Sequence, residues 1–161
     1  TQSSLNGRYP RALDGTAFPC DFVLGALMAV RREAYAATGG FDPAYFMYVE
    51  EVDWCRRLGT HGWEVWHLPG AVATHHAGQS TRTVAGRMFV ELHRSRLRYY
   101  RRHWSPIAVA AARAITWLGC RSRARQLARE TLSDRAAQVD ACHEVMRMVA
   151  PGGTMDHRAD G

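Results

Sequence analysis

The chain has 161 residues, enough for one domain with a buried core or for part of a longer protein. Apolar residues make up 47% and charged residues 22%, a balance that excludes disordered, collagen-like and heavily disulfide-linked chains. All 21 basic side chains are arginine, and with 15 acidic ones the net charge is +6. Twelve of these arginines lie in residues 82–129, with the single acid Glu91. This excess predicts either an anionic partner or a solvated basic helix surface.

The first forty residues predict a loop, a strand and a short helix. Residues 1–20 are rich in Gly, Pro and Ser and are interpreted as loop. Residues 22–31 form an apolar run that predicts a buried strand or strand pair. A short helix is expected over 32–38, ended by the glycine pair 39–40. Asp42 in the following turn is well placed to cap the next element.

A second helix is predicted from the helical spacing of Val52, Cys55 and Leu58, with glycines beyond its end. Two strands are expected next, over 63–68 and 71–75, separated by a Pro-Gly turn. A polar loop follows. The fold class predicted for this half of the chain is α/β.

The second half predicts three helices. The first covers 83–103, and Ser105-Pro106 has the residue types of a helix start for the second, which we expect to end near Leu118. The third is expected over 122–149, and residues 151–161 as a disordered tail. The longest apolar run, 107–119, is interrupted by an arginine and is too short to span a bilayer.

The four cysteines form no CxxC pair, so we expect reduced, buried thiols rather than a zinc site or a disulfide framework. They are Cys20, Cys55, Cys120 and Cys142. No secretory signal is recognisable at the first residues, which do not begin with Met. We therefore expect the chain to begin partway through a longer protein.

Three carboxylates, Glu50, Glu51 and Asp53, stand within four residues, directly after an aromatic run. At the start of a helix Glu50 and Asp53 share a face, and Glu51 points away from them. One interpretation is structural, because acids at a helix N-terminus interact favourably with the helix dipole. The other is catalytic, because aromatic neighbours desolvate a carboxylate and raise its pKa toward that of a general base.

A histidine pair, His75 and His76, ends the second predicted strand. Adjacent residues on a strand face opposite sides, so at most one of the two enters a given site. A histidine beside carboxylate and phosphate oxygens suits Mn²⁺ or Mg²⁺. A packed or surface histidine is the alternative.

Residues 25–81 resemble the C-terminal half of the catalytic domain of family 2 glycosyltransferases, in particular the rhamnosyltransferase-like group. The resemblance rests on a run of motifs in order: small residues before VRR, GGFD, an aromatic turn, an acidic helix, GW, and an HH-x-G-x-S loop. It implies a partial GT-A fold followed by a helical region. The expected divisions are 1–82 for the acceptor-side part of the transferase domain, 83–150 for an arginine-rich helical extension, and the tail.

The resemblance also implies roles for individual residues. Glu51 matches the catalytic base, which takes the proton of an acceptor hydroxyl as it attacks a nucleotide-sugar with inversion. The family usually has Asp there, so the extra methylene moves the carboxylate. Glu50, Asp53 and Trp54 are expected at the acceptor, with a structural hydrogen-bonding role as the alternative for Asp53. His75 matches a metal ligand of some relatives, with His76 as the substitute if the register shifts.

One departure from the family pattern is large. GT-A enzymes hold the nucleotide diphosphate and its metal with a D-x-D signature in an N-terminal half, and this sequence contains no D-x-D. We therefore expect the chain alone to be inactive. A divalent metal, Mn²⁺ or Mg²⁺, is expected only together with a nucleotide-binding half that lies outside this sequence.

The arginine-rich segment suggests a membrane partner. Cations alternate with aromatic residues over 93–104, directly before the apolar run 107–119, a combination typical of the bilayer interface. The residues expected to face an anionic membrane are Arg98, Tyr99, Tyr100, Arg101, Arg102 and Trp104. The alternative is a solvated helix packed on the catalytic domain.

The predicted function is therefore sugar transfer from a nucleotide-sugar to a glycan or lipid-linked acceptor, in cell-surface polysaccharide or glycolipid synthesis. The expected location is the inner face of the cytoplasmic membrane. One alternative is a non-catalytic interaction domain descended from a glycosyltransferase. The other is a basic nucleic-acid-binding module, which no helix-turn-helix, RNP-like or zinc-finger signature supports.

Overall fold

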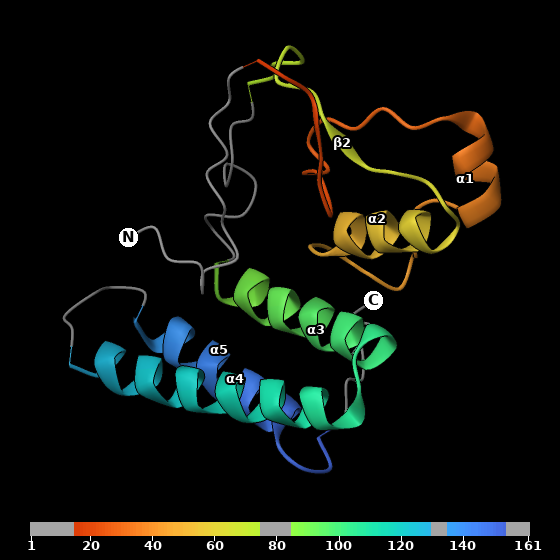
Figure 1. Cartoon of the computed structure of the whole chain (residues 1–161). Helices are drawn as coiled ribbons and strands as arrows, with labels where there is room; N and C mark the ends of the chain where they lie inside the picture. Colours follow the sequence, from red (N-terminus) through yellow and green to blue (C-terminus); the bar gives the residue numbers. More distant parts are fainter. Residues whose placement is uncertain (1–14, 75–84, 130–134, 154–161) are drawn as a thin grey trace. The chain divides into compact units, whose positions relative to one another are not determined.

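The computed structural model describes residues 15–74, 85–129 and 135–153. These residues belong to two compact units (Figure 1). Unit 1 holds the described residues of Thr1–Phe41 and Glu51–His76, and unit 2 those of Asp42–Glu50 and Ala77–Gly161. The elements follow in the order β1, α1, α2, β2, α3, α4 and α5.

Helix α1 (Arg32–Thr38) confirms the predicted short helix of unit 1. It ends at Gly39, whose φ of 74° is left-handed and whose N–H donates to the Tyr35 carbonyl over 2.8 Å. A residue with a Cβ is disfavoured in that conformation, so the predicted glycine stop has a direct structural reason.

Helix α2 (Glu50–Thr60) is also confirmed, and it supplies most of the unit 1 core. Trp54 and Leu58 pack with Ala34 of α1 in a small buried cluster. The Trp54 indole N–H donates to Thr38 Oγ1 over 2.8 Å, and the Thr38 hydroxyl in turn donates to the Ala34 carbonyl. The buried polar atom of the indole is thereby satisfied, as burial requires.

The strands of unit 1 differ from the prediction. Strand β1 (Phe18–Pro19) lies in the stretch expected to be loop, and it pairs antiparallel with β2 (Trp66–His67), the centre of the expected strand 63–68. The strand predicted over 22–31 is wrong: this segment turns at Leu24–Leu27 and forms no β-ladder. Its hydrophobic side chains are largely exposed at the start and packed on the small core only toward the end. An apolar run shows that a segment has something to bury, but a strand also requires a hydrogen-bonding neighbour.

The strand predicted over 71–75 is likewise not seen over 71–74, where Val72 is 86% exposed, and His75 lies outside the described residues. The α/β class is therefore present only in a reduced form. In the described residues, helices accompany a single two-stranded sheet.

The described residues of unit 2 contain three helices: α3 (Ala85–His103), α4 (Pro106–Leu127) and α5 (Arg135–Val149). Helix α5 packs against both of the others (Figure 1). The buried cluster among them includes Leu97, Cys120, Cys142 and Val145. A Cβ on Gly86 would lie 3.2 Å from the Ala137 carbonyl oxygen, so α3 approaches α5 closely at a position where glycine has no side chain.

The start of α4 is confirmed and its end is not. Ser105 accepts a hydrogen bond from the Ala108 N–H with its side chain, and Pro106 is the first helical residue. The helix continues to Leu127 instead of ending near Leu118, and α5 begins at Arg135 rather than near residue 122. The reason is packing: Cys120, Ala124 and Leu127 fall on one buried face that prolongs the helix. No helix in the described ranges has the length and apolar character needed to cross a membrane.

Candidate active site

The backbone directly before the acidic cluster is strained. Tyr48 and Val49 have φ values of 67° and 68°, in the left-handed region. That region is disfavoured for side chains with a Cβ and most of all for a β-branched residue such as Val49. Such residues cost on the order of 1–3 kcal/mol each and are found preferentially at functional sites. Here the strained pair immediately precedes Glu50, the first residue of α2.

Glu51 is half-buried in the first turn of α2. A Cβ on Gly25 would lie 3.7 Å from the Glu51 Cβ, so the 22–31 segment passes directly over this side chain. One turn further along the helix lies Cys55, which is buried; burial raises the pKa of its thiol, and the nearby Glu51 carboxylate raises it further. The Glu51 side chain therefore lies in a partly desolvated place, beside the turn at Leu24–Leu27.

Asp53 is fully buried and forms an ion pair with Arg57, whose Nε donates to Asp53 Oδ2 over 2.8 Å. The Arg57 guanidinium also donates to the carbonyls of Thr38 and Gly40, at the end of α1. Asp53 thus anchors the arginine that fastens α2 to the end of α1. Of the two roles expected for Asp53, these contacts support the structural one.

Trp54 is 5% exposed. Its ring meets Tyr35 and Phe41 edge-on, with centroids 6.0 and 4.9 Å away. These contacts give the indole a packing role, and its expected contact with an acceptor stays a prediction. Glu50 differs, since its Oε2 is buried without a hydrogen-bond partner in the described structure. A buried carboxylate oxygen in this state is able to accept a bond from a ligand hydroxyl.

The expected metal ligands His75 and His76 lie outside the described residues. Within the described ranges, no three His, Cys, Asp or Glu side chains are grouped so as to hold a metal ion. The described residues therefore do not form a metal site by themselves.

The residues expected to face a membrane divide into two sets in unit 2. Arg98 and Arg102 turn toward Asp42, with nitrogen–oxygen distances of 3.8 and 2.8 Å, and Arg98 also lies over the Tyr45 ring. Asp42 Oδ1 also accepts from the Ala44 N–H, so Asp42 caps its own turn and not the next helix as predicted, because α2 begins only at Glu50. These two arginines therefore hold residues 42–45 onto α3.

The aromatic residues of the same segment stack on one another. Tyr100 and Trp104 are parallel, with ring centroids 4.1 Å apart, and Tyr99 packs against His103. Trp104 is 41% exposed, and it lies with Arg101 at a pocket on α4. Whether this surface contacts a membrane remains a prediction.

Two features were missed by sequence reasoning. One is the Asp53–Arg57 ion pair, which the spacing of four residues could have indicated, because residues at i and i+4 share a helix face. Ile107, Ile115 and Leu118 of α4 are 84%, 70% and 60% exposed. The available signal was their helical spacing: Ile115 and Leu118 follow Ile107 by 8 and 11 residues, which places the three on one broad side of a helix.

The comparisons with known proteins bear on the chemistry of this site. The family described as "Glycosyltransferase like family 2" matches residues 10–102, more than half of the chain. The chain belongs to glycosyltransferase family 2. The matched range includes the acidic cluster, the strained pair before it and all of helix α3 except its last residue, His103.

Curated relatives of this family 2 chain include rhamnosyltransferases. An N-acetylglucosaminyl-diphospho-decaprenol L-rhamnosyltransferase of Mycobacterium tuberculosis is 42% identical over 69 residues, covering 43% of this chain and 22% of the relative. Rhamnosyltransferase WbbL of Escherichia coli K12 is 34% identical over 82 residues, covering 51% of this chain and 31% of the relative. The chain thus spans less than a third of the length of either relative. No solved structure matches.

Proposed function

We propose that this chain is the acceptor-side part of a glycosyltransferase that moves a sugar from a nucleotide-sugar to a hydroxyl of a lipid-linked glycan, with inversion. The observation that carries the proposal is the half-buried Glu51 on a strained helix start, inside the region matched by family 2. The names of the two relatives support rhamnose as the sugar, and one of them supports a lipid-linked acceptor. The process we propose is the synthesis of a cell-surface polysaccharide or glycolipid.

In the proposed step Glu51 is the general base. Its carboxylate takes the proton of the acceptor hydroxyl while that oxygen attacks the anomeric carbon. The bond from this carbon to the nucleoside diphosphate breaks on the opposite face, so the anomeric configuration inverts. Partial burial helps, because a poorly solvated carboxylate is a stronger base than one in water.

The neighbouring residues hold this base in place. The strained Tyr48–Val49 pair sets where α2 begins, and the Asp53–Arg57 pair fixes the helix against the end of α1. Glu50 is the residue proposed to hold the acceptor, because its buried Oε2, which has no partner in the described structure, can accept a hydrogen bond from an acceptor hydroxyl. A base held in one orientation is more effective, since proton transfer depends on alignment.

Donor binding requires groups beyond those described here. We propose that a nucleotide-binding part with a D-x-D signature holds the diphosphate and a divalent cation, Mn²⁺ or Mg²⁺, with His75 as the ligand from this chain. The expected site of action is the inner face of the cytoplasmic membrane, with the arginine-rich helices of unit 2 near anionic lipid.

The test is a transfer assay on the complete reading frame that contains this chain. It uses nucleotide-activated rhamnose, prenyl-diphosphate-linked N-acetylglucosamine and Mn²⁺ or Mg²⁺, with NMR of the product. We expect transfer with inversion, and no transfer by the 161-residue chain alone. Retention of configuration would overturn the mechanism. Turnover by the isolated chain would overturn the need for a separate donor part.

A further inference from the structure

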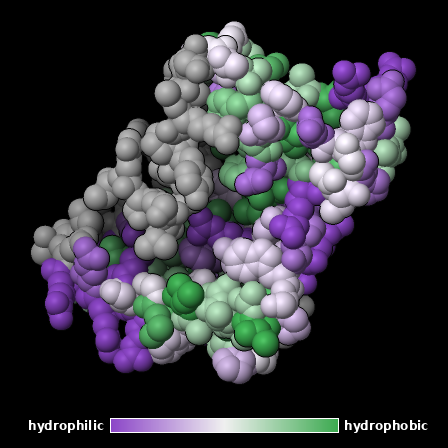
Figure 2. Space-filling model, in the orientation of Figure 1, coloured by the Kyte–Doolittle hydropathy of each residue, from purple (hydrophilic) through white to green (hydrophobic). Residues whose placement is uncertain are grey.

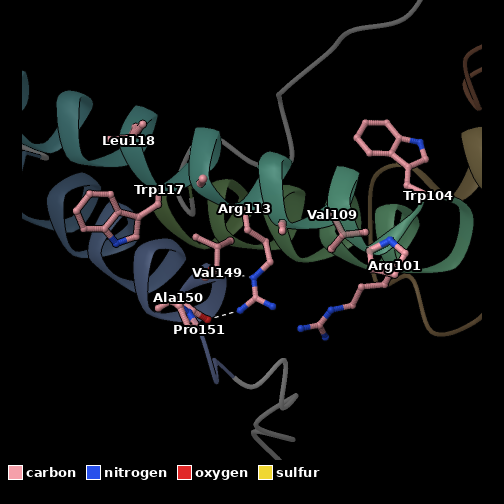
Figure 3. A pocket seen from close by; sticks show the side chains of 12 residues that line it. Arg101, Trp104, Val109, Arg113, Trp117, Leu118, Val149, Ala150 and Pro151 are labelled. Carbon is pink, nitrogen blue, oxygen red and sulfur yellow. Dashed lines mark hydrogen bonds between the residues drawn. The ribbon is translucent and has the colours of Figure 1, made fainter.

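Unit 2 contains a pocket of about 800 Å³ along α4, bordered by the end of α3 and the end of α5 (Figure 3). Its walls are mainly apolar, from Val109, Trp117, Leu118 and Val149, with Trp104 at one end. This volume is in the range of small-molecule sites. Water against such walls is unfavourable, so the pocket favours an apolar occupant.

The surface beside the pocket is apolar as well. Figure 2 shows hydrophobic side chains gathered over α4. Ile107 and Ile115 are 84% and 70% exposed on the same helix, and Leu118 belongs both to this surface and to the pocket wall. An occupant longer than the pocket would therefore continue onto apolar surface.

The charged groups of the pocket are two arginines. Arg113 donates through Nε to the Val149 carbonyl over 2.9 Å, and through Nη2 to the Ala150 carbonyl. It therefore caps the C-terminal end of α5. Arg101 is exposed and makes no hydrogen bond or ion pair within the described residues. Helix α4 itself has four arginines and no acid. The potential at the pocket is thus positive, and its complement is an anion attached to an apolar chain.

We propose that this pocket binds the hydrocarbon chain of a prenyl-phosphate lipid, with the phosphate at Arg101. The chain packs between Trp104 and Trp117, and its phosphate group forms a charge-assisted hydrogen bond with the guanidinium. The identification of this lipid with the carrier of the acceptor rests on the proposed function. The binding itself does not, because it involves neither a sugar nor a donor.

The test measures the binding of farnesyl phosphate to the 161-residue chain. Tryptophan fluorescence is the readout, because two tryptophans line the pocket. Farnesol and inorganic phosphate are the comparison probes. We expect saturable binding of farnesyl phosphate, at least tenfold weaker binding of farnesol, and none of phosphate. The Arg101→Gln variant is expected to bind both prenyl probes equally, while Arg125→Gln, an exposed arginine of α4 outside the pocket, keeps the preference.

A matched pair of variants locates the site. Ala114 lines the pocket and Ala111 lies on the same helix outside it, and both are exposed. We expect Ala114→Phe to fill the pocket and weaken farnesyl phosphate binding at least tenfold, and Ala111→Phe to leave it unchanged. Circular dichroism confirms that both variants are folded.

Three results would overturn the proposal: absence of saturable binding, equal weakening by the two alanine variants, or a chain that is dimeric without lipid and becomes monomeric in Ala114→Phe. The last would show that a second copy of the chain occupies the pocket. If farnesyl phosphate binds as expected but the complete reading frame transfers no sugar, the proposed function is contradicted and the proposed lipid site is still supported.

Discussion

Replacing Asp53 by Asn tests whether the acidic cluster contains a structural ion pair. Asp53 is 0% exposed and the Arg57 side chain 14%, so the substitution leaves a mostly buried guanidinium without its counter-charge. Breaking a buried pair from one side costs about 3–5 kcal/mol. Arg57 keeps its bonds to the carbonyls of Thr38 and Gly40, which places the expected loss near 3 kcal/mol.

Amide hydrogen exchange is the suitable assay, because it reports on each unit separately. We expect Asp53→Asn to reduce the opening free energy of α2 amides by about 3 kcal/mol, the lower end of the range for a broken buried pair, and to leave α5 amides unchanged. The control Asp21→Asn removes an exposed carboxylate of the same unit and is expected to change little. A loss below about 1 kcal/mol in α2 would refute the reasoning, since exposed ion pairs have that value.

Three further predictions concern unit 2. Gly86→Val should lower the free energy of unfolding by about 1–3 kcal/mol through overpacking. The control Gly119→Val, with open space around it, should change this free energy by less than about 0.5 kcal/mol. Equal effects of the two variants in urea denaturation would contradict the close contact between α3 and α5. Burial lowers the pKa of His93 below 6.5, so the unfolded state binds the proton more readily and stability should fall as pH drops below about 6.5; a His93→Gln variant with the same pH dependence would count against this. Burial raises the pKa of Cys120 to about 11, so its thiol should resist alkylation at neutral pH in the folded chain, and rapid labelling seen by mass spectrometry would argue against it.

The helices were predictable because their signals are local. The glycine stop at residue 39, the serine cap at residue 105 and the apolar spacing of α2 each act within a few residues, and the structure confirms all three. The extension of α4 to Leu127 was not predicted, since it depends on the packing of its last turns against α5.

The strands and much of the site depend on distant residues. Residues 18–19 pair with residues 66–67, and the sequence of neither segment indicates which segment it pairs with. For the same reason the sequence left two roles open for Asp53, at the acceptor or in a structural hydrogen bond, and did not show what surrounds Glu51. This information comes from Arg57 and the end of α1 for Asp53, and from the overlying Gly25 segment for Glu51.

The most direct test of the account is the kcat for sugar transfer by the complete reading frame carrying Glu51→Gln. Glutamine keeps the shape but cannot accept the proton, and the lost interaction with the helix dipole is only about 0.3–1 kcal/mol, so the variant should fold. A general base contributes about 10²–10⁴-fold. We therefore expect kcat to fall by about that factor, while Glu33→Gln, an exposed carboxylate of α1, keeps the wild-type rate. A Glu51→Gln enzyme within about tenfold of wild type, below the range for a general base, would contradict the assignment of Glu51 as the base.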